Sequence, residues 1–281
     1  MVKIYGAVGY TILNHTKLNK YIIVFADIHT KLSDCCASSL EKYTICNQIN
    51  IADWLKQKFN TSHILLEEIT RGNFQLEELW PLSNHIQDLK KLFLDNSNKI
   101  KPIDIRPFFI PFSWEVLNTL DKNTMLLKNY LKEIDNFFSI QNKYLIKILD
   151  YYNYEKIKDI NIGKHFLYIK KKYYKFLIKN KNYLNSSLFD IKSTNISIFN
   201  TINNLLDYIM EWYTCTIIIT CDNYHILHTG LFHSENIIKL LIKYYDYNII
   251  TTFGINTINE ANKYSSHNGC IDIAESFDKI F

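Results

Sequence analysis

The sequence predicts an α/β fold: a mostly parallel sheet flanked by helices, with a large all-helical insertion. In the first third of the chain, apolar runs typical of strands alternate with helical patterns, which favours parallel βαβ units. Gly (7) and Pro (4) are scarce among 281 residues, which argues against a β-sandwich with many tight turns. Residues 114–213 contain almost no Gly or Pro and have the pattern of several long helices.

The elements follow from local patterns in chain order. A helix is predicted over 51–59, because Ile51, Trp54, Leu55 and Phe59 recur at helical spacing behind the N-cap candidate Asn50. The other predicted elements are strands at 21–28, 63–68, 99–105, 224–229 and 247–253, and helices at 74–95 and 234–245. The last 25 or so residues are weakly patterned.

The domain organisation follows from the same pattern. Residues 1–113 and 214–281 are predicted to form an α/β core, and 114–213 a helical insertion, together one composite domain. A hydrophobic content of 47% with 21% charged residues indicates a globular chain. A net charge of +4 is too small to indicate a nucleic-acid-binding protein, so this class is not expected.

The chain lacks the pattern of a signal peptide, and its apolar runs are too short for a membrane span. The protein is therefore expected to be soluble and cytoplasmic. Its six cysteines form no CxxC pair and are expected to be reduced. The abundance of Ile, Asn, Lys and Tyr suggests an A/T-rich genome, such as that of a large DNA virus. In that case the location would be the host cytoplasm or the virion.

Four predicted strands lead into polar residues that can perform chemistry. Their segments end at His29, Glu68, Arg106 and His233. Ligands of open α/β sheets bind beyond the carboxyl ends of the strands, where side chains from several strands converge. The sequence therefore predicts one site built from these strand ends.

Two of these segments share a pattern. Ala26-Asp-Ile-His29 and Gly230-Leu-Phe-His233 each place a small residue three positions before a histidine. A small residue allows a tight backbone turn, and histidine is the commonest protein ligand for metals. Between the two segments, Glu67-Glu68-Ile-Thr-Arg71 and Asp104-Ile-Arg106 supply carboxylates and guanidinium groups.

This order of motifs resembles the superfamily that includes the TraB/PrgY proteins, the TIKI proteases, the ChaN haem-binding lipoproteins and the erythromycin esterases. TraB- and TIKI-like members carry a GxxH motif after the first strand, a Glu with a following Arg, an "iDR" strand end, and a second GxxH near the C-terminus. The resemblance spans about 20–250. This chain departs from the pattern in having Ala26 for the first Gly and in separating Asp104 from Arg106 by one residue.

The resemblance implies a hydrolase that cleaves an ester or peptide bond in a small-molecule or peptide substrate, with a divalent ion such as Mn, Co or Zn. The implied metal ligands are His29, Glu67 and His233. Two imidazoles and a carboxylate leave positions open for water. A metal-free variant of the kind found in erythromycin-esterase-like proteins would instead use His29 as a base.

The remaining residues of the motifs are implied to complete the catalysis. Glu68 or Asp27 would act as the general base, and Arg71 or Arg106 would stabilise an oxyanion. Asp104 belongs to the same strand end, on the same side of an extended segment as Arg106.

The charged residues of these motifs also have a structural explanation. Glu67 and Glu68 could pair with Arg71 or a lysine, and Asp104 and Arg106 could form an ion pair with each other. His225 and His228 lie within an apolar run and are expected to face the core or a neighbouring helix rather than a metal. The rival class of function is a non-catalytic viral structural or host-interaction protein. The oligomeric state is left open.

The segment 164–181 is rich in lysine and aromatic residues. On a helix, Phe166, Ile169, Tyr173 and Leu177 share a face, and the lysines spread over the remainder. Such patterns occur in helices that bind nucleic acid or anionic membranes, but a solvated amphipathic helix is more common and is the expectation here.

Overall fold

The structure is a computed structural model that describes residues 2–15, 17–28, 32, 48–69, 84–112, 124–139, 160–221, 224–264 and 266–281. His29 and Arg71 lie outside these ranges, as do the first ten residues of the helix predicted over 74–95. All structural statements below concern the described residues.

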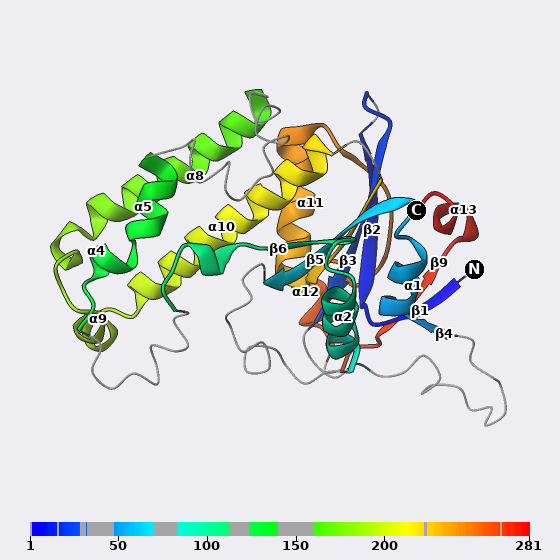
Figure 1. The fold of residues 1–281 in the computed structure, drawn as a ribbon, viewed down its shortest axis with the longest axis horizontal. Coiled ribbons are helices and arrows are strands. Elements are labelled where there is room, and N and C mark those ends of the chain that lie inside the picture. The colour runs from blue at the N-terminus through cyan, green and yellow to red at the C-terminus, as the bar shows by residue number, and fades with distance from the viewer. Residues whose placement is uncertain are drawn as a thin grey trace. The chain divides into compact units, whose positions relative to one another are not determined.

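The strands and helices follow one another in a mixed order along the chain (Figure 1). The strands are β1 (Val2–Tyr5), β2 (Gly9–His15), β3 (Lys20–Asp27), β4 (Gln48–Asn50), β5 (Ser62–Ile69), β6 (Ile100–Asp104), β7 (Tyr224–Gly230), β8 (Asn248–Gly254) and β9 (Cys270–Ile273). The α-helices are α1 (Ile51–Gln57), α2 (Asn84–Asp95), α4 (Leu127–Tyr130), α5 (Lys132–Ser139), α8 (Ile160–Lys179), α9 (Leu188–Thr194), α10 (Ser197–Thr220), α11 (Leu231–Tyr245), α12 (Ile258–Ala261) and α13 (Glu275–Asp278). Two 3₁₀ helices are η1 (Arg106–Phe108) and η2 (Lys181–Tyr183).

The main sheet has the strand order β6-β5-β7-β3-β2-β8. Its centre is parallel, since β7 pairs in parallel with both β5 and β3. β2 pairs antiparallel with β3, and β8 antiparallel with β2. The prediction of an α/β fold with a sheet flanked by helices is confirmed. Pro102 lies in β6, an edge strand, where a missing backbone N–H is tolerated.

Local signals account for several element boundaries. The side chain of Asn50 accepts a hydrogen bond from the backbone N–H of Ala52 and caps α1, as the sequence indicates. α11 ends at Tyr245, and its C-cap Asp246 has a φ of 55°, the left-handed conformation common at helix C-termini. Strands β1, β2, β4 and β9 were not predicted. β4, β1 and β9 form a separate three-stranded sheet of strands of three or four residues, too short for a periodic pattern.

The chain divides into two compact units. Unit 1 consists of residues 1–68, 72–103 and 222–281, and unit 2 of residues 69–71 and 104–221. Unit 1 contains both sheets with α1, α2 and α11–α13. The described helices between Asp104 and Cys221, namely α4, α5, α8, α9 and α10, all belong to unit 2.

Two apolar clusters cover opposite faces of the main sheet in unit 1. One face buries Phe25, Leu66 and Ile226 in a cluster with residues of α1 and α2, including Trp54 and Leu89. The other face buries Ala26 together with Leu231 of α11. In Figure 1, α1 and α2 accordingly lie on one side of the central strands and α11 on the other.

Aromatic rings fill the core of unit 2. Phe137 of α5 lies 5.4 Å from Phe166 of α8 and 6.0 Å from Trp212 of α10, measured between ring centroids. α10 continues through an Ile- and Thr-rich segment to Thr220, seven residues beyond the predicted insertion boundary at 213. Threonine hydroxyls bond to carbonyls four residues back, as Thr216 does to Trp212 O at 2.8 Å, which satisfies these buried groups within the helix.

Two further expectations concern cysteines and membranes. Cys215 and Cys221 are free, but Cys270 is disulfide-bonded, so the expectation that all the cysteines are reduced is wrong for this residue. Among the described helices, none combines the length and apolarity required to cross a bilayer.

His225 lies at the amino end of β7 and is fully buried. Neither of its ring nitrogens has a hydrogen-bond partner among the described residues. Its ring stacks on that of His63, with centroids 5.6 Å apart. Burial above all, together with His63 and Lys20, lowers the pKa of His225 from 6.5 to about 3. The prediction that His225 faces the core is confirmed.

Replacing His225 by leucine should stabilise the fold. Above pH 6.5 we expect a gain of about 1–3 kcal/mol, because the variant removes a buried, unsatisfied imidazole N–H. Because the unfolded state binds the extra proton between pH 6.5 and about 3, native His225 costs stability as the pH falls through that window, up to about 5 kcal/mol in total. Urea unfolding at several pH values measures both effects.

The control is His63→Leu, which removes the exposed neighbour and leaves His225 in place. This variant should still show most of the loss of folding stability that the wild type shows as the pH falls. If wild type and His225→Leu lost stability equally between pH 6.5 and 3, the buried imidazole would not be its source.

Candidate functional site

The carboxyl ends of the three central parallel strands lie side by side. Asp27, the last residue of β3, is level with Gly230, the last residue of β7. Leu66 of β5 is level with His228 of β7. The polar residues that follow Leu66 and His228 therefore emerge at one edge of the sheet, where ligands of α/β folds bind.

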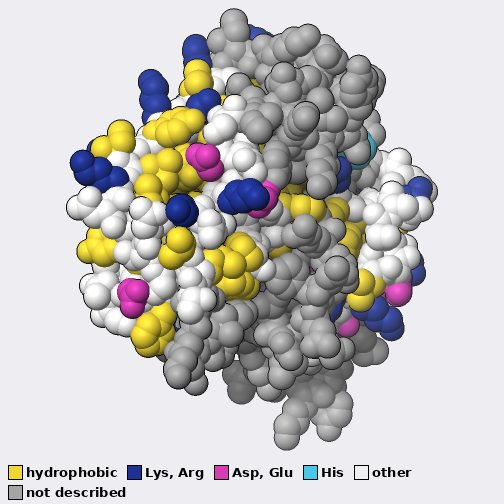
Figure 2. Space-filling view, turned by 60° about the vertical axis from the view of Figure 1, so that its left-hand side comes forward, with side chains coloured by type: hydrophobic (Ala, Val, Ile, Leu, Met, Phe, Trp, Pro, Cys, Tyr) yellow, Lys and Arg dark blue, Asp and Glu magenta, His cyan; other side chains and the backbone are white. Residues whose placement is uncertain are grey.

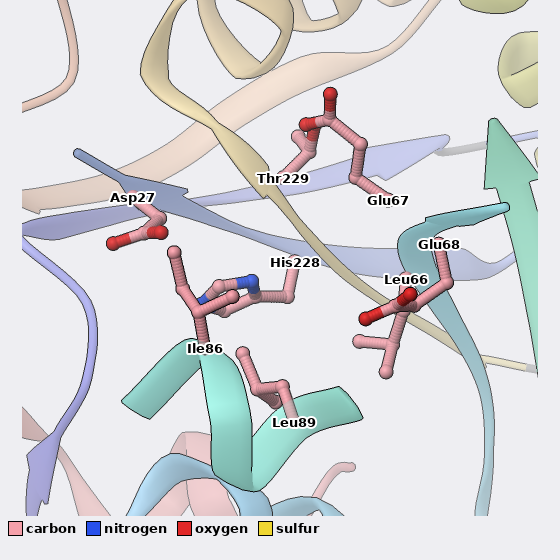
Figure 3. Close-up of a pocket in the computed structure, with 8 residues that line it drawn as sticks. All are labelled: Asp27, Leu66, Glu67, Glu68, Ile86, Leu89, His228 and Thr229. Carbon is pink, nitrogen blue, oxygen red and sulfur yellow. The ribbon is translucent and has the colours of Figure 1, made fainter. Parts of the chain in front are cut away.

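The alternation of side chains along a strand divides these polar groups between two faces (Figure 3). Asp27 and His228 lie on the face covered by α2, as does Glu68, two residues beyond Leu66. Glu67 and Thr229 point away from α2 (Figure 3). Glu67 and Glu68, adjacent in sequence, therefore lie on opposite faces of the sheet.

On the face opposite α2, Glu67 is fixed to the turn between β7 and α11. Its Oε2 accepts a hydrogen bond from the Thr229 hydroxyl at 2.6 Å and another from the Gly230 backbone N–H at 2.8 Å. Gly230 is the N-cap of α11, whose dipole favours a negative charge at this end. The carboxylate of Glu67 thus has a defined orientation, with its second oxygen directed to another residue.

That second residue is His233, in the first turn of α11. Its Nε2 lies 3.7 Å from Oε1 of Glu67, and both side chains are more than nine-tenths buried. The separation is too long for a direct hydrogen bond. The structure therefore brings together two of the three residues predicted as metal ligands.

On the α2 face, Asp27 and His85 form a buried pair. His85 Nε2 lies 2.8 Å from Asp27 Oδ1, and both side chains are fully buried. His85 Nδ1 has no partner among the described residues. A proton on Nδ1 would be a buried, unsatisfied donor, so we assign the tautomer in which Nε2–H donates to Asp27.

A small cavity of about 20 Å³ adjoins this pair. Leu66, Ile86 and Leu89 form its apolar wall. Its polar lining consists of Asp27, Glu67, Glu68, His228 and Thr229 (Figure 3). His228 Nε2 lies 3.2 Å from the carbonyl oxygen of Gly6. The volume is sufficient for about one water molecule.

Asp104 and Arg106 pair with each other at the start of unit 2. The guanidinium of Arg106 donates to both carboxylate oxygens of Asp104, at 2.8 Å from Nε and 2.9 Å from Nη2. Its Nη1 donates to Asp207 of α10 at 2.9 Å. Arg106 thus pairs with two carboxylates and joins η1 to α10, which matches the ion-pair explanation given for Asp104 and Arg106.

His29 and Arg71 lie outside the described residues. In the part of the chain that the structure describes, no group of three His, Cys, Asp or Glu residues lies close enough together to hold a metal ion. Of the three residues predicted as metal ligands, Glu67 and His233 are described and lie near each other.

Sequence reasoning did not assign three residues to the candidate site. His85 shows no signal in the sequence, because its pairing with Asp27 depends on how α2 packs against β3. His228 was assigned to the core, yet it also lines the cavity. Thr229 precedes Gly230 of the GxxH motif, and the alternation along β7 could have indicated that it shares a face with Glu67.

Comparison of the chain with protein-family models, with curated proteins and with solved structures finds no match.

The Asp27–His85 pair should be measurable by a double-mutant cycle. His85→Leu and Asp27→Asn should each destabilise the fold. We expect a coupling energy of about 1.5–3 kcal/mol, because a hydrogen bond to a buried carboxylate is stronger than a neutral one. Urea unfolding of the two single variants and the double variant gives the coupling. A coupling below about 0.5 kcal/mol would contradict a hydrogen bond from His85 to the Asp27 carboxylate.

Proposed function

We propose that the chain is a hydrolase that cleaves an ester or peptide bond and holds a divalent metal ion with Glu67, His233 and His29. The observation that supports this most strongly is the approach of Glu67 Oε1 to His233 Nε2, at 3.7 Å, at the carboxyl edge of the sheet. Glu67 comes from β5 and His233 from α11, and the two residues belong to two of the motifs of the family resemblance.

The donor set fits a metal ion. Imidazole nitrogens and carboxylate oxygens bind divalent metals at about 2.0–2.2 Å, so two ligands of one ion lie roughly 3–4 Å apart. The 3.7 Å separation falls in this range. The hydrogen bonds from Thr229 and Gly230 hold one oxygen of Glu67 and direct the other towards His233. Such support of a ligand by its neighbours is typical of metal sites.

The third ligand in the proposal is His29, on the basis of its position in the sequence. It follows Asp27, the last residue of β3, by two residues. β3 is the parallel neighbour of β7, whose end leads into His233. Two histidines and one carboxylate suit Mn, Co or Zn.

A bound divalent ion would lower the pKa of a coordinated water and polarise the substrate carbonyl. Asp27 and Glu68 line the adjoining cavity and are the candidates to accept a proton from water. His85 would hold the Asp27 carboxylate in position. Arg106 is engaged by two carboxylates, so Arg71 is the better candidate to stabilise an oxyanion.

The wider assignments are part of the same proposal. The substrate would be a small molecule or peptide, and the protein would act in the cytoplasm, or in the host cytoplasm or virion if it is viral. Disulfides are typical of oxidising compartments, and the disulfide at Cys270 is an observation against the cytoplasmic location.

One observation favours the rival, non-catalytic function. The hydrogen bonds of Glu67 to Thr229 and Gly230 join β5 to the start of α11 whether or not a metal binds. A structural or host-interaction protein could retain this connection for stability alone. The two functions differ in whether Oε1 of Glu67 and the imidazole of His233 bind a metal ion.

The test is the metal content of the purified protein by mass spectrometry, after incubation with Mn, Co or Zn and removal of free ion. We expect near-stoichiometric metal in the wild type and a loss of at least about tenfold in Glu67→Gln and in His233→Ala, because each variant removes a ligand. Glu68→Gln is the matched control, since it changes the neighbouring carboxylate on the other face and should retain the metal.

Hydrolysis of a panel of esters and peptides should decrease in parallel with the metal. A protein that takes up no metal under any of these conditions would leave the structural function as the better account. Retention of metal in both Glu67→Gln and His233→Ala would place the ion elsewhere.

A further inference from the structure

We propose that the exposed face of α8 binds the surface of an anionic lipid bilayer. This proposal concerns unit 2 and is independent of the proposed hydrolase site. It rests on the charge of α8, on the apolar side chains that the helix exposes, and on how the two are arranged.

The charge of α8 is entirely positive. The helix, Ile160–Lys179, contains no Asp or Glu, and its positive side chains are Lys164, Lys170, Lys171, Lys172, Lys175 and Lys179. Solvated helices in globular proteins commonly mix acidic and basic residues, which form pairs three or four positions apart. The composition of α8 instead suits a partner that carries a dense negative charge.

One side of α8 is fixed in the core of unit 2. Phe166, Ile169 and Tyr173 are buried. Phe166 packs on Trp212 of α10, with ring centroids 5.2 Å apart, and Tyr173 stacks on Phe138 of α5 at 5.0 Å. The sequence-based expectation of an amphipathic helix is therefore correct for this side, and the orientation of the opposite side within unit 2 is defined.

The opposite side exposes large apolar residues among the lysines. Ile178 is 73% exposed, Leu167 51% and Tyr168 41%. Leu167, Lys171, Tyr174 and Ile178 follow one another at helical spacing of four, three and four residues, and form one stripe. Figure 2, which brings the left-hand side of Figure 1 forward, shows hydrophobic side chains and Lys or Arg next to one another on the surface.

Two lysines of α8 also lie over tyrosine rings, which belong to α8 itself and to α10. The Nζ of Lys172 lies 5.0 Å from the ring centroid of Tyr168 and 4.8 Å from that of Tyr208. Lys170 lies 5.8 Å from the ring of Tyr174. These contacts hold both charge and aromatic surface at the exposed side of the helix.

The aliphatic residues distinguish a bilayer from a nucleic acid. Leu167 and Ile178 have no ring for a base to stack on, whereas both can insert between lipid acyl chains. α8 also lacks arginine, the residue most used to read bases. Apolar insertion together with lysine contacts to anionic headgroups provides the two attractions that stable peripheral binding requires.

The experiment is co-sedimentation of the full chain with vesicles of phosphatidylcholine alone or mixed with phosphatidylserine. We expect binding to the mixed vesicles only, weakened by added salt. Lys171→Glu/Lys175→Glu/Lys179→Glu should lower the affinity at least about tenfold. Leu167→Gln/Ile178→Gln should lower it severalfold, because it removes apolar insertion without changing the charge.

The matched control for charge is Lys56→Glu/Lys91→Glu/Lys263→Glu, three exposed lysines of unit 1. The control for apolar exposure is Leu94→Gln, at a residue 56% exposed on α2. Both should bind vesicles like the wild type. Circular dichroism verifies that every variant is folded.

Three results would overturn the proposal. They are absence of binding to phosphatidylserine vesicles at low salt, equal loss in the α8 and unit 1 charge variants, and salt-sensitive binding of DNA or RNA through the same lysines without vesicle binding. The last result would assign α8 to a nucleic acid instead.

Discussion

The carboxylate of Glu67 connects the parts of unit 1 on which the candidate site depends. It leaves the end of β5, accepts hydrogen bonds from Thr229 and Gly230 at the end of β7, and lies at the positive end of α11. The same contacts direct its other oxygen to His233. A buried carboxylate is costly without such partners. The same hydrogen bonds to Glu67 therefore connect β5 to α11 and fix the geometry of the Glu67–His233 pair.

The alternation of side chains along a strand, every second one on the same face, determines where the other residues of the site lie. It places Glu67 with His233 on the α11 side and Glu68 with Asp27, His85 and His228 on the α2 side. Glu67 from the first set and Asp27, Glu68 and His228 from the second line a cavity with room for about one water molecule. A hydrolase of the proposed type needs this division, since metal ligands and a general base must approach one water from different directions.

The sequence predicted the parts that depend on local pattern. Strands 21–28, 63–68 and 224–229 correspond to β3, β5 and β7, and their carboxyl ends converge because parallel strands in register must end together. His85 could not be found in this way, since its contact with Asp27 spans 58 residues and arises from the packing of α2. Likewise β1 and β9 pair across almost the whole chain. Arg106 carried a catalytic expectation, yet it pairs with Asp104 and Asp207, and Asp207 is 101 residues distant in the sequence.

Anomalous X-ray diffraction from crystals grown with Mn²⁺ tests the central claim most directly. The account predicts an anomalous peak within about 2.0–2.2 Å of both Glu67 Oε1 and His233 Nε2, with Oε2 still bonded to Thr229 and Gly230. The same map would show whether His29 completes the coordination. Crystals with no peak at this position, and with His233 hydrogen-bonded directly to Glu67, would contradict the account and leave the pair as a structural connection between β5 and α11.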